Sequence, residues 1–280
     1  MHDRPYRSAL YIPGSKDRAL DKARGLFVDV ILFDLEDAVT PDAKVAARDT
    51  LAAALAAGGY GTRLRIVRIN GLDTPWGAAD AAAVAAMACD AVLLPKVNTT
   101  ADVDALAAMV PDLPIWAMME TPQGILNAAS IAAHPRIAGF VLGTNDLAKD
   151  LNSRGRAALM VALQMCLLAA RAAGIVALDG VYNAFKDEEG LRDECTQGRD
   201  MGFDGKTLIH PAQVAIANAV FGPTADEIDL ARRQIAAFEA AQAQGQGVAV
   251  VDGRIVENLH IVTAQATLAK ADAIAALESA

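Results

Sequence analysis

Cysteine is scarce in this sequence, and none of it is spaced for a bridge or a metal. The three cysteines, Cys89, Cys166 and Cys195, lie far apart and form no C-x-x-C pair. The spacing excludes a disulfide framework and fits a reducing cytoplasm. The charged residues at the start of the chain are followed by no apolar stretch, so we expect no signal peptide.

An excess of basic charge is also missing. The net charge is -9 and the pI about 4.9, which argues against a nucleic-acid partner because such partners need a basic face. The longest apolar stretch, residues 157–178, is interrupted by Gln164, Arg171 and Gly174. It therefore predicts a buried helix leading into a strand, and we expect no membrane partner.

Motifs that hold nucleotides or activate serine are absent too. No G-x-G-x-x-G or Walker-type loop occurs, and no G-x-S-x-G elbow of a serine thioesterase. Aromatic residues make up only 5% of a chain that is 54% hydrophobic, so the core must consist of Ala, Val, Leu and Ile. A length of 280 residues suits a one-domain α/β barrel.

What the sequence does contain is a regular alternation of short apolar runs with Ala-rich helical stretches. Such runs are typical of parallel strands that are covered on both faces. Eight of them predict an α/β fold, a (β/α)₈ TIM barrel over residues 1–222, with a doubly wound sheet as the rival. The runs are 9–12, 30–33, 65–69, 91–94, 115–119, 139–142, 175–178 and 207–209.

The chain continues beyond what a barrel needs. Residues 224–244 predict an amphipathic helix with Thr224 as its N-cap. An extended piece over 247–257 and a last helix over 258–277 follow. We expect residues 223–280 to form a C-terminal helical extension that caps the barrel rim or packs on a neighbouring subunit.

Carboxylates follow several of the predicted strands. Their ends meet at one rim of a barrel, where mutual repulsion would raise their pKa values unless a cation lay among them. Glu120 and Asp146 are oxygen ligands of the kind that Mg²⁺ prefers, but they would equally suit caps for the following helices. The residues alone leave both interpretations open.

Arg68 ends an apolar run and therefore needs an anionic partner to offset its burial. It either forms a structural ion pair with Glu36 or Asp37, or donates to a substrate oxygen with its planar fork. Glu36 and Asp37 are then supporting residues, whereas Asp34 is expected to point to the other side of the strand end. Asp179 is expected to contact a metal shell only indirectly.

The motifs together resemble the citrate lyase β-subunit-like (HpcH/HpaI aldolase) family, which includes malyl-CoA and citramalyl-CoA lyases. The branch that the chain most resembles is that of the (3S)-malyl-CoA thioesterases, through residues 179–190 and 250–260. The family motifs are Arg7-Ser8 with Pro13-Gly14, residues 33–39, Arg68-Ile69-Asn70, Glu120-Thr121 with Gly124, residues 143–147, and residues 202–206 with His210-Pro211.

This resemblance implies roles for particular residues. It makes Glu120 and Asp146 the ligands of Mg²⁺, with Mn²⁺ as an alternative, and Arg68 the substrate-gripping arginine. It also implies a homotrimer or homohexamer in which the C-terminal segment closes over a neighbour's site. Glu257 takes the place of the family's catalytic aspartate there, one methylene longer. Lys16, Arg18 and Lys22 either meet the phosphates of CoA or form a solvated helix face.

The activity implied is Mg²⁺-dependent hydrolysis of (3S)-malyl-CoA to malate and free CoA. Arg68 and the metal would polarise the thioester carbonyl, Glu120 would also face the substrate, and Glu257 would activate water. The alternatives are a malyl-CoA or citramalyl-CoA lyase, which needs the same parts, and a citrate lyase β-type subunit acting on an acyl carrier.

Overall fold

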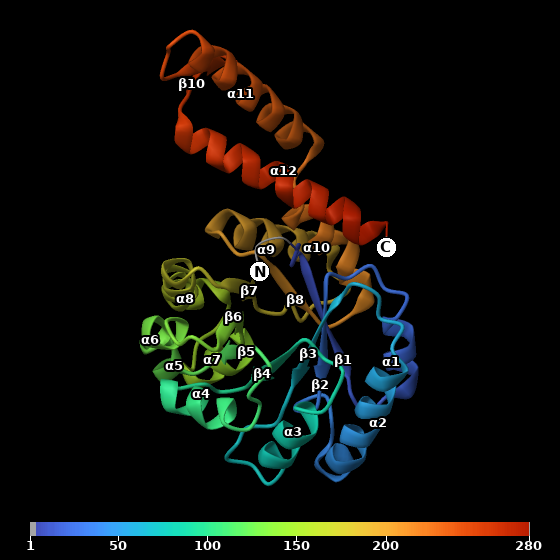
Figure 1. Cartoon of the computed structure of the whole chain (residues 1–280). Coiled ribbons are helices and arrows are strands. Elements are labelled where there is room, and N and C mark those ends of the chain that lie inside the picture. The colour runs from blue at the N-terminus through green and yellow to red at the C-terminus, as the bar shows by residue number, and fades with distance from the viewer. Residues whose placement is uncertain (1–3, 280) are drawn as a thin grey trace. The chain divides into compact units, whose positions relative to one another are not determined.

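Eight apolar strands form the centre of the larger compact unit, residues 6–218. The computed structural model describes residues 4–279 (Figure 1), and the strands pair in chain order as one closed, parallel barrel. Pairing of β1 with β8, from Ser8 opposite Lys206, closes the ring. The predicted (β/α)₈ fold is confirmed. The strands are β1 (Ser8–Pro13), β2 (Val30–Asp34), β3 (Leu64–Arg68), β4 (Ala91–Leu94), β5 (Ile115–Met119), β6 (Ile137–Leu142), β7 (Val176–Asp179) and β8 (Gly205–Leu208).

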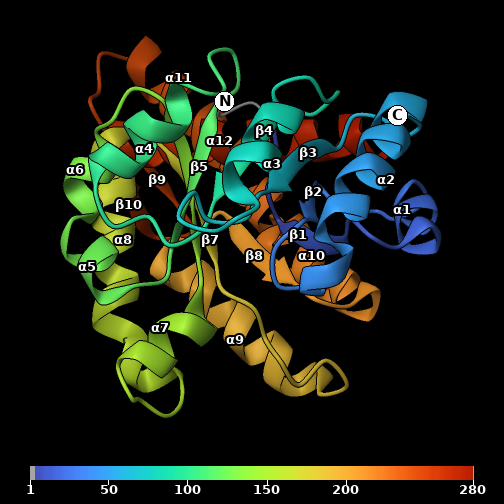
Figure 2. The same cartoon turned by 90° about the horizontal axis from the view of Figure 1, so that it is seen from below.

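Helices lie outside the ring of strands, as Figures 1 and 2 show from two directions. Alanine gives them high helix propensity and small faces that pack closely on the barrel. Short 3₁₀ turns cover Pro41–Ala43, Arg156–Leu159 and Pro211–Gln213. The helices are α1 (Asp17–Ala23), α2 (Lys44–Ala57), α3 (Gly77–Val84), α4 (Thr100–Ala107), α5 (Pro122–Leu126), α6 (Ala128–Ala132), α7 (Thr144–Asp150), α8 (Met160–Ala173), α9 (Glu188–Met201) and α10 (Val214–Phe221).

Alternate residues of the strands fill the barrel interior, because successive side chains of a strand point to opposite faces. Ala9, Leu32, Ile66, Trp116 and Leu178 belong to this buried cluster. The next inward position beyond Ala9, Leu32, Ile66 and Trp116 carries a polar group or a sulfur, so the apolar filling stops where the strands end. Apolar side chains therefore fill the barrel interior, and polar side chains cover it at the carboxyl ends of the strands.

The long apolar stretch of the sequence is one of the surrounding helices. Among the described residues, Arg156–Ala173 is long and apolar enough to cross a membrane by length and composition alone. In the structure α8 buries one face, including Leu163 and Cys166, and contacts β6 and β7. The predicted course of a helix leading into a strand is confirmed, and all three cysteines are free thiols.

The chain divides at Asn218, within α10, into two compact units that are described separately. The C-terminal unit contains α11 (Ala225–Ala243), β9 (Ala249–Val251), β10 (Arg254–Val256) and α12 (Asn258–Glu278). Thr224 caps α11 by accepting a hydrogen bond from the Glu227 amide at 3.2 Å, as predicted. Asp252 and Gly253 both have positive φ, 50° and 74°, which is the two-residue hairpin turn that joins β9 and β10.

Candidate active site

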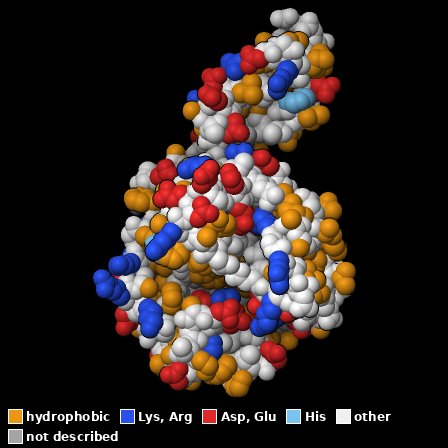
Figure 3. Space-filling view, turned by 180° about the vertical axis from the view of Figure 1, so that it is seen from behind, with side chains coloured by type: hydrophobic (Ala, Val, Ile, Leu, Met, Phe, Trp, Pro, Cys, Tyr) orange, Lys and Arg blue, Asp and Glu red, His pale blue; other side chains and the backbone are white. Residues whose placement is uncertain are grey.

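A pocket of about 310 Å³ opens at the carboxyl ends of the barrel strands. This is the face on which barrel enzymes carry their catalytic groups, because the loops there vary without disturbing the barrel. Acidic and basic side chains lie side by side in a hollow of the barrel surface in Figure 3. The lining residues are Tyr11, Asp34, Asp37, Ala38, Arg68, Met118, Glu120, Leu142, Gly143, Thr144, Asn145, Asp146, Val181 and Ile209.

Glu120 follows β5 and is only 3% exposed. Its Oε1 accepts a hydrogen bond of 2.8 Å from the backbone N–H of Lys96. Lys96 has a φ of 52°, a conformation that costs a non-glycine residue energy and is concentrated at functional sites. Burial, and then the nearby charge of Glu36, raise the pKa of Glu120 to about 8. Burial and the charge of Glu36 thus outweigh the stabilisation that the Lys96 N–H and Arg68 give to the ionised carboxylate.

Asp146 lies in the first turn of α7, directly after β6. Its carboxylate is 3.6 Å from the Lys96 ammonium and about one third exposed. Gly143 starts this turn, and a Cβ there would lie 2.4 Å from Oε2 of Glu120. The close approach of the β6–α7 turn to Glu120 therefore requires glycine, and it brings both predicted metal ligands to one pocket.

Arg68 is held mainly by Asp34. Its Nε and Nη2 donate to the two carboxylate oxygens of Asp34 at 2.7 Å each, and both side chains are almost fully buried. The expectation that Asp34 points away was wrong. Asp34 and Arg68 are register partners on β2 and β3, so they face the same side, and Asp34 continues the inward series Val30 and Leu32.

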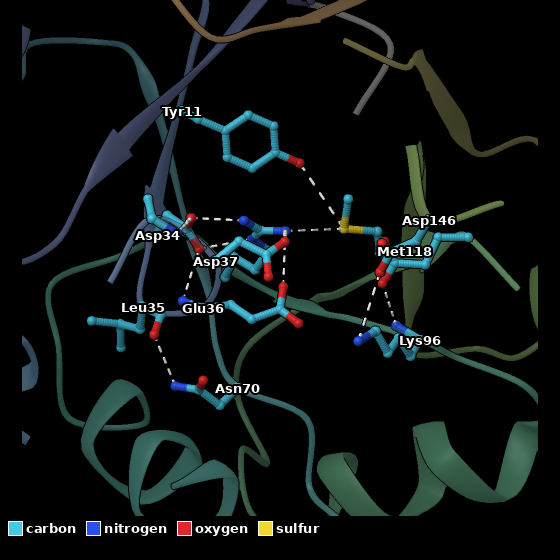
Figure 4. A network of polar contacts seen from close by, with 12 residues as sticks. Tyr11, Asp34, Leu35, Glu36, Asp37, Asn70, Lys96, Met118 and Asp146 are labelled. Atoms are coloured by element: carbon cyan, nitrogen blue, oxygen red, sulfur yellow. Dashed lines mark hydrogen bonds and ion pairs between the residues drawn. The ribbon is translucent and has the colours of Figure 1, made fainter. Parts of the chain in front are cut away.

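Glu36 and Asp37 also face Arg68, as the ion-pair interpretation of this arginine predicted. Nη1 of Arg68 lies 2.8 Å from Glu36 and 3.3 Å from Asp37 (Figure 4). Burial raises the pKa of Glu36 to about 7, opposed by Arg68 and helped by Asp37 and Asp34. Asp37 itself is 72% exposed. Three carboxylates thus surround one guanidinium on the wall of the pocket.

Tyr11 and Met118 complete the floor, and the sequence reasoning missed both. The Tyr11 ring lies against the Arg68 guanidinium, 4.9 Å from centroid to Cζ. Met118 Sδ lies within contact distance of both residues. Period-two alternation could have found them, because Tyr11 is the next inward position after Ala9, and Met118 the next after Trp116.

A family model described as HpcH/HpaI aldolase/citrate lyase matches residues 7–211, which span all eight barrel strands. The chain belongs to the HpcH/HpaI aldolase/citrate lyase family.

Three relatives and one solved structure are similar to this member of the HpcH/HpaI family over nearly its whole length. It is 67% identical over 278 residues to a (3S)-malyl-CoA thioesterase of Cereibacter sphaeroides, covering 98% of each chain. It is 36% identical to citrate lyase subunit beta of Leuconostoc mesenteroides, over 97% of this chain and 95% of that one. It is 34% identical to an L-malyl-CoA/beta-methylmalyl-CoA lyase of C. sphaeroides, over 98% and 96%. The structure of CitE from Mycobacterium tuberculosis in complex with magnesium, acetoacetate and coenzyme A aligns with a TM-score of 0.80 and 30% identity, over 96% and 98%.

Asp179 takes part in an ion-pair network of this family member. Its carboxylate accepts from Arg156 at 3.0 and 2.9 Å and from the fully buried Lys206 at 2.9 Å, and Lys206 also binds Glu194. Asp179 is not among the residues that line the pocket. Asp179 anchors a buried charge network between β7, β8 and α9, and its indirect contact with a metal shell stays a prediction.

The remaining predicted residues lie away from the pocket lining. Lys16, Arg18 and Lys22 are exposed, in and just before α1, the helix that follows β1. Glu257 is exposed in the C-terminal unit, where it is the N-cap residue of α12 and its backbone N–H donates to His260 at 3.0 Å. The pocket and Glu257 therefore belong to different compact units.

Proposed function

We propose that this protein hydrolyses (3S)-malyl-CoA to malate and free CoA, with a divalent metal held by Glu120 and Asp146. The observation that carries the proposal is 67% identity, over 98% of both chains, to a protein named (3S)-malyl-CoA thioesterase. The pocket supports it, because the carboxylates of Glu120 and Asp146 and the guanidinium of Arg68 all line it.

The residues present fit magnesium. Glu120 and Asp146 both line the pocket, and within residues 4–279 no group of three or more His, Cys, Asp or Glu side chains is arranged to hold an ion. A metal held by these two carboxylates would take its other ligands from water and substrate. Magnesium suits such a site because it keeps waters and substrate oxygens in its shell, and Mn²⁺ fits the same donors. Burial and the nearby charge of Glu36 disfavour the ionised form of Glu120, and a bound cation would stabilise that form. When bound, the metal supplies a Lewis acid and a template for the α-hydroxy-carboxylate end of the substrate.

Arg68 presents its remaining guanidinium nitrogen, Nη1, to the thioester carbonyl oxygen. Asp34 fixes the orientation of the fork through two hydrogen bonds. Glu36 and Asp37 keep the arginine in place from the loop after β2. Donors that are oriented before the reaction stabilise developing oxyanion charge without reorganising, which is why their positions matter.

Glu257 supplies the base from a neighbouring subunit in this proposal. The C-terminal unit has an apolar exterior near Glu257, since Val250, Ile255 and Leu259 are each more than 60% exposed. Apolar surface of this kind commonly marks a place where another protein binds. We propose that residues 223–280 close over the pocket of a second copy in a homotrimer or homohexamer, and that Glu257 takes a proton from the attacking water.

Lys16, Arg18 and Lys22 are proposed to bind the phosphates of CoA. Their side chains are exposed and follow the end of β1, so an anion at the rim can reach them without desolvating a buried charge. The free thiols fit an enzyme of the cytoplasm, where we expect it.

A lyase is the second candidate, favoured by the 34% identity to an L-malyl-CoA/beta-methylmalyl-CoA lyase. Both reactions place negative charge on the same thioester oxygen, so the products decide between them. The purified chain is incubated with (3S)-malyl-CoA and Mg²⁺, and the products are separated. Malate with free CoA supports the proposal. Acetyl-CoA with glyoxylate replaces it by the lyase, and no reaction of the free thioester points to the citrate lyase type of subunit.

A further inference from the structure

Two hydrogen-bond donors on the pocket floor point at one poor acceptor. The Tyr11 hydroxyl and Nη1 of Arg68 lie 4.0 and 3.7 Å from Sδ of Met118, as the dashed lines in Figure 4 show. A thioether sulfur is only a weak acceptor. The three side chains come from β1, β3 and β5, alternate strands whose inward side chains form one layer of a barrel.

Tyr11 has no better partner in the substrate-free protein. Among the described residues, its hydroxyl forms no hydrogen bond apart from the contact with Met118. Burial raises the pKa of Tyr11 above its ordinary value of 10.0, so the phenol keeps its proton and remains a donor. Tyr11 is partly buried, and its hydroxyl has only a thioether in reach on the pocket floor. Buried polar groups usually have a hydrogen-bond partner, so this hydroxyl is suited to a group of the substrate.

Arg68 alone is a limited donor for that partner. Asp34 occupies its Nε and Nη2, and the remaining Nη1 is shared with Glu36 and Asp37. A guanidinium whose charge is offset by three carboxylates stabilises an additional oxyanion less than a free one would. The Tyr11 hydroxyl is a second donor on the pocket floor, and it forms no hydrogen bond with a carboxylate.

We infer that Tyr11 is a second donor to the thioester carbonyl oxygen, beside Arg68, and thus a catalytic residue of the proposed hydrolysis, on which this inference rests. The substrate oxygen enters where both donors now meet the Met118 sulfur. The water oxygen bonds to the carbonyl carbon while Glu257 takes one water proton, the carbonyl electron pair moves to the oxygen, and both donors hold the oxyanion. Collapse breaks the carbon–sulfur bond, and CoA leaves as a thiolate that takes the proton held by Glu257. The new carboxyl group of malate loses its remaining proton to solvent and becomes the carboxylate.

Tyr11→Phe tests this, because it removes one oxygen and keeps the ring against Arg68. Loss of one oxyanion donor costs about a hundredfold in kcat, and we expect that loss with KM nearly unchanged. Tyr60→Phe is the matched control, since the Tyr60 hydroxyl donates to the Leu20 carbonyl in the core, outside the pocket lining. A kcat for Tyr11→Phe equal to that of Tyr60→Phe overturns the inference.

Binding of a thioether analogue, with CH₂ in place of the carbonyl, separates a carbonyl contact from a carboxylate contact. Equal affinity of wild type and Tyr11→Phe for this analogue supports the carbonyl oxygen as the partner. Weaker binding by the variant places the hydroxyl on the substrate carboxylate and overturns the inference while leaving the hydrolase intact. Absence of thiol release by the wild type on (3S)-malyl-CoA, in contrast, overturns the proposed function itself.

Discussion

At the level of single residues, the proton on Glu120 is what a metal must displace first. With a pKa raised from 4.5 to about 8 by burial and then by Glu36, the carboxyl is largely protonated at neutral pH in the metal-free protein. Because metals bind the carboxylate, affinity for Mg²⁺ should rise with pH up to about 8 and level off above it. Calorimetric titration with Mg²⁺ at several pH values below and above the raised pKa measures the affinity. Repeating it in buffers of different ionisation enthalpy measures the released proton.

The same shift has the opposite sign for folding. The folded metal-free protein holds this proton between the ordinary and the raised pKa, while the unfolded chain has lost it. The free energy of unfolding should therefore fall as the pH rises through this window. Glu120→Gln is the control, because it removes the titration together with the metal site. An affinity of the wild type for Mg²⁺ that is the same at low and high pH would contradict the assignment of Glu120 as a metal ligand.

Residue by residue, the sequence predicted the chemistry of the site better than its contacts. Glu120, Asp146 and Arg68 were recognised by type and position, and they line one pocket. Asp34 was assigned to the wrong side of the strand, although alternation along β2 places it on the inward face with Val30 and Leu32. Asp179 could not be assigned, because its partner Arg156 comes from a turn before α8 that no local pattern links to β7.

At the level of elements, the turn between β6 and α7 controls the geometry of the metal site. Gly143→Ala should push Glu120 aside, since the added Cβ would lie 2.4 Å from both its Cβ and its Oε2. We expect at least about a tenfold loss of Mg²⁺ affinity, the usual scale for disturbing the support of a metal ligand, with the barrel retained. Titration followed by calorimetry, alongside circular dichroism, measures both.

Gly247→Ala is the matched control for this substitution. Gly247 has no heavy atom within 4 Å of the added Cβ and no positive φ, so the same change should leave metal affinity and fold unaltered. If Gly143→Ala binds Mg²⁺ as tightly as Gly247→Ala does, Glu120 does not need its present position to hold the metal.

The elements themselves were the most predictable part of the fold. All eight apolar runs are strands, and the two C-terminal helices occur where their patterns placed them. The extended piece between these helices is a hairpin of β9 and β10, and its turn was not predicted. The left-handed conformation of Lys96 was not predictable, because a lysine carries no signal for positive φ; the surrounding contacts impose it. That single backbone angle helps to orient the N–H that binds Glu120.

At the level of the whole molecule, the proposed metal ligands and the proposed base lie in different compact units. Glu120→Gln and Glu257→Gln should each abolish hydrolysis, and Glu257→Gln should leave substrate binding largely intact. Mixed after dissociation and reassembly, the two variants should regain about a quarter of wild-type activity, because in a head-to-tail ring one site in four combines an intact barrel with an intact neighbouring tail. Thiol release by the mixture is compared with that of each variant alone.

A mixture that remains as inactive as its components would place Glu257 over the pocket of its own chain. The sequence predicted the tail and its elements, but periodicity describes only what a segment buries within itself. The subunit that the C-terminal segment covers depends on exposed apolar residues such as Val250 and Ile255. No sequence pattern predicts which surface these residues contact.

The sulfur on the pocket floor also makes the enzyme a target for peroxide. Hydrogen peroxide converts a methionine thioether to the sulfoxide with release of water, and the new S=O group is a strong acceptor in place of a weak one. At Met118 that oxygen would lie between the Tyr11 hydroxyl and Arg68 and accept from both donors, so neither could bind the substrate oxygen. Peroxide should therefore inactivate the wild type, methionine sulfoxide reductase should restore it, and Met118→Leu should be resistant. An oxidant could in this way silence thioester hydrolysis without touching any of the three cysteines.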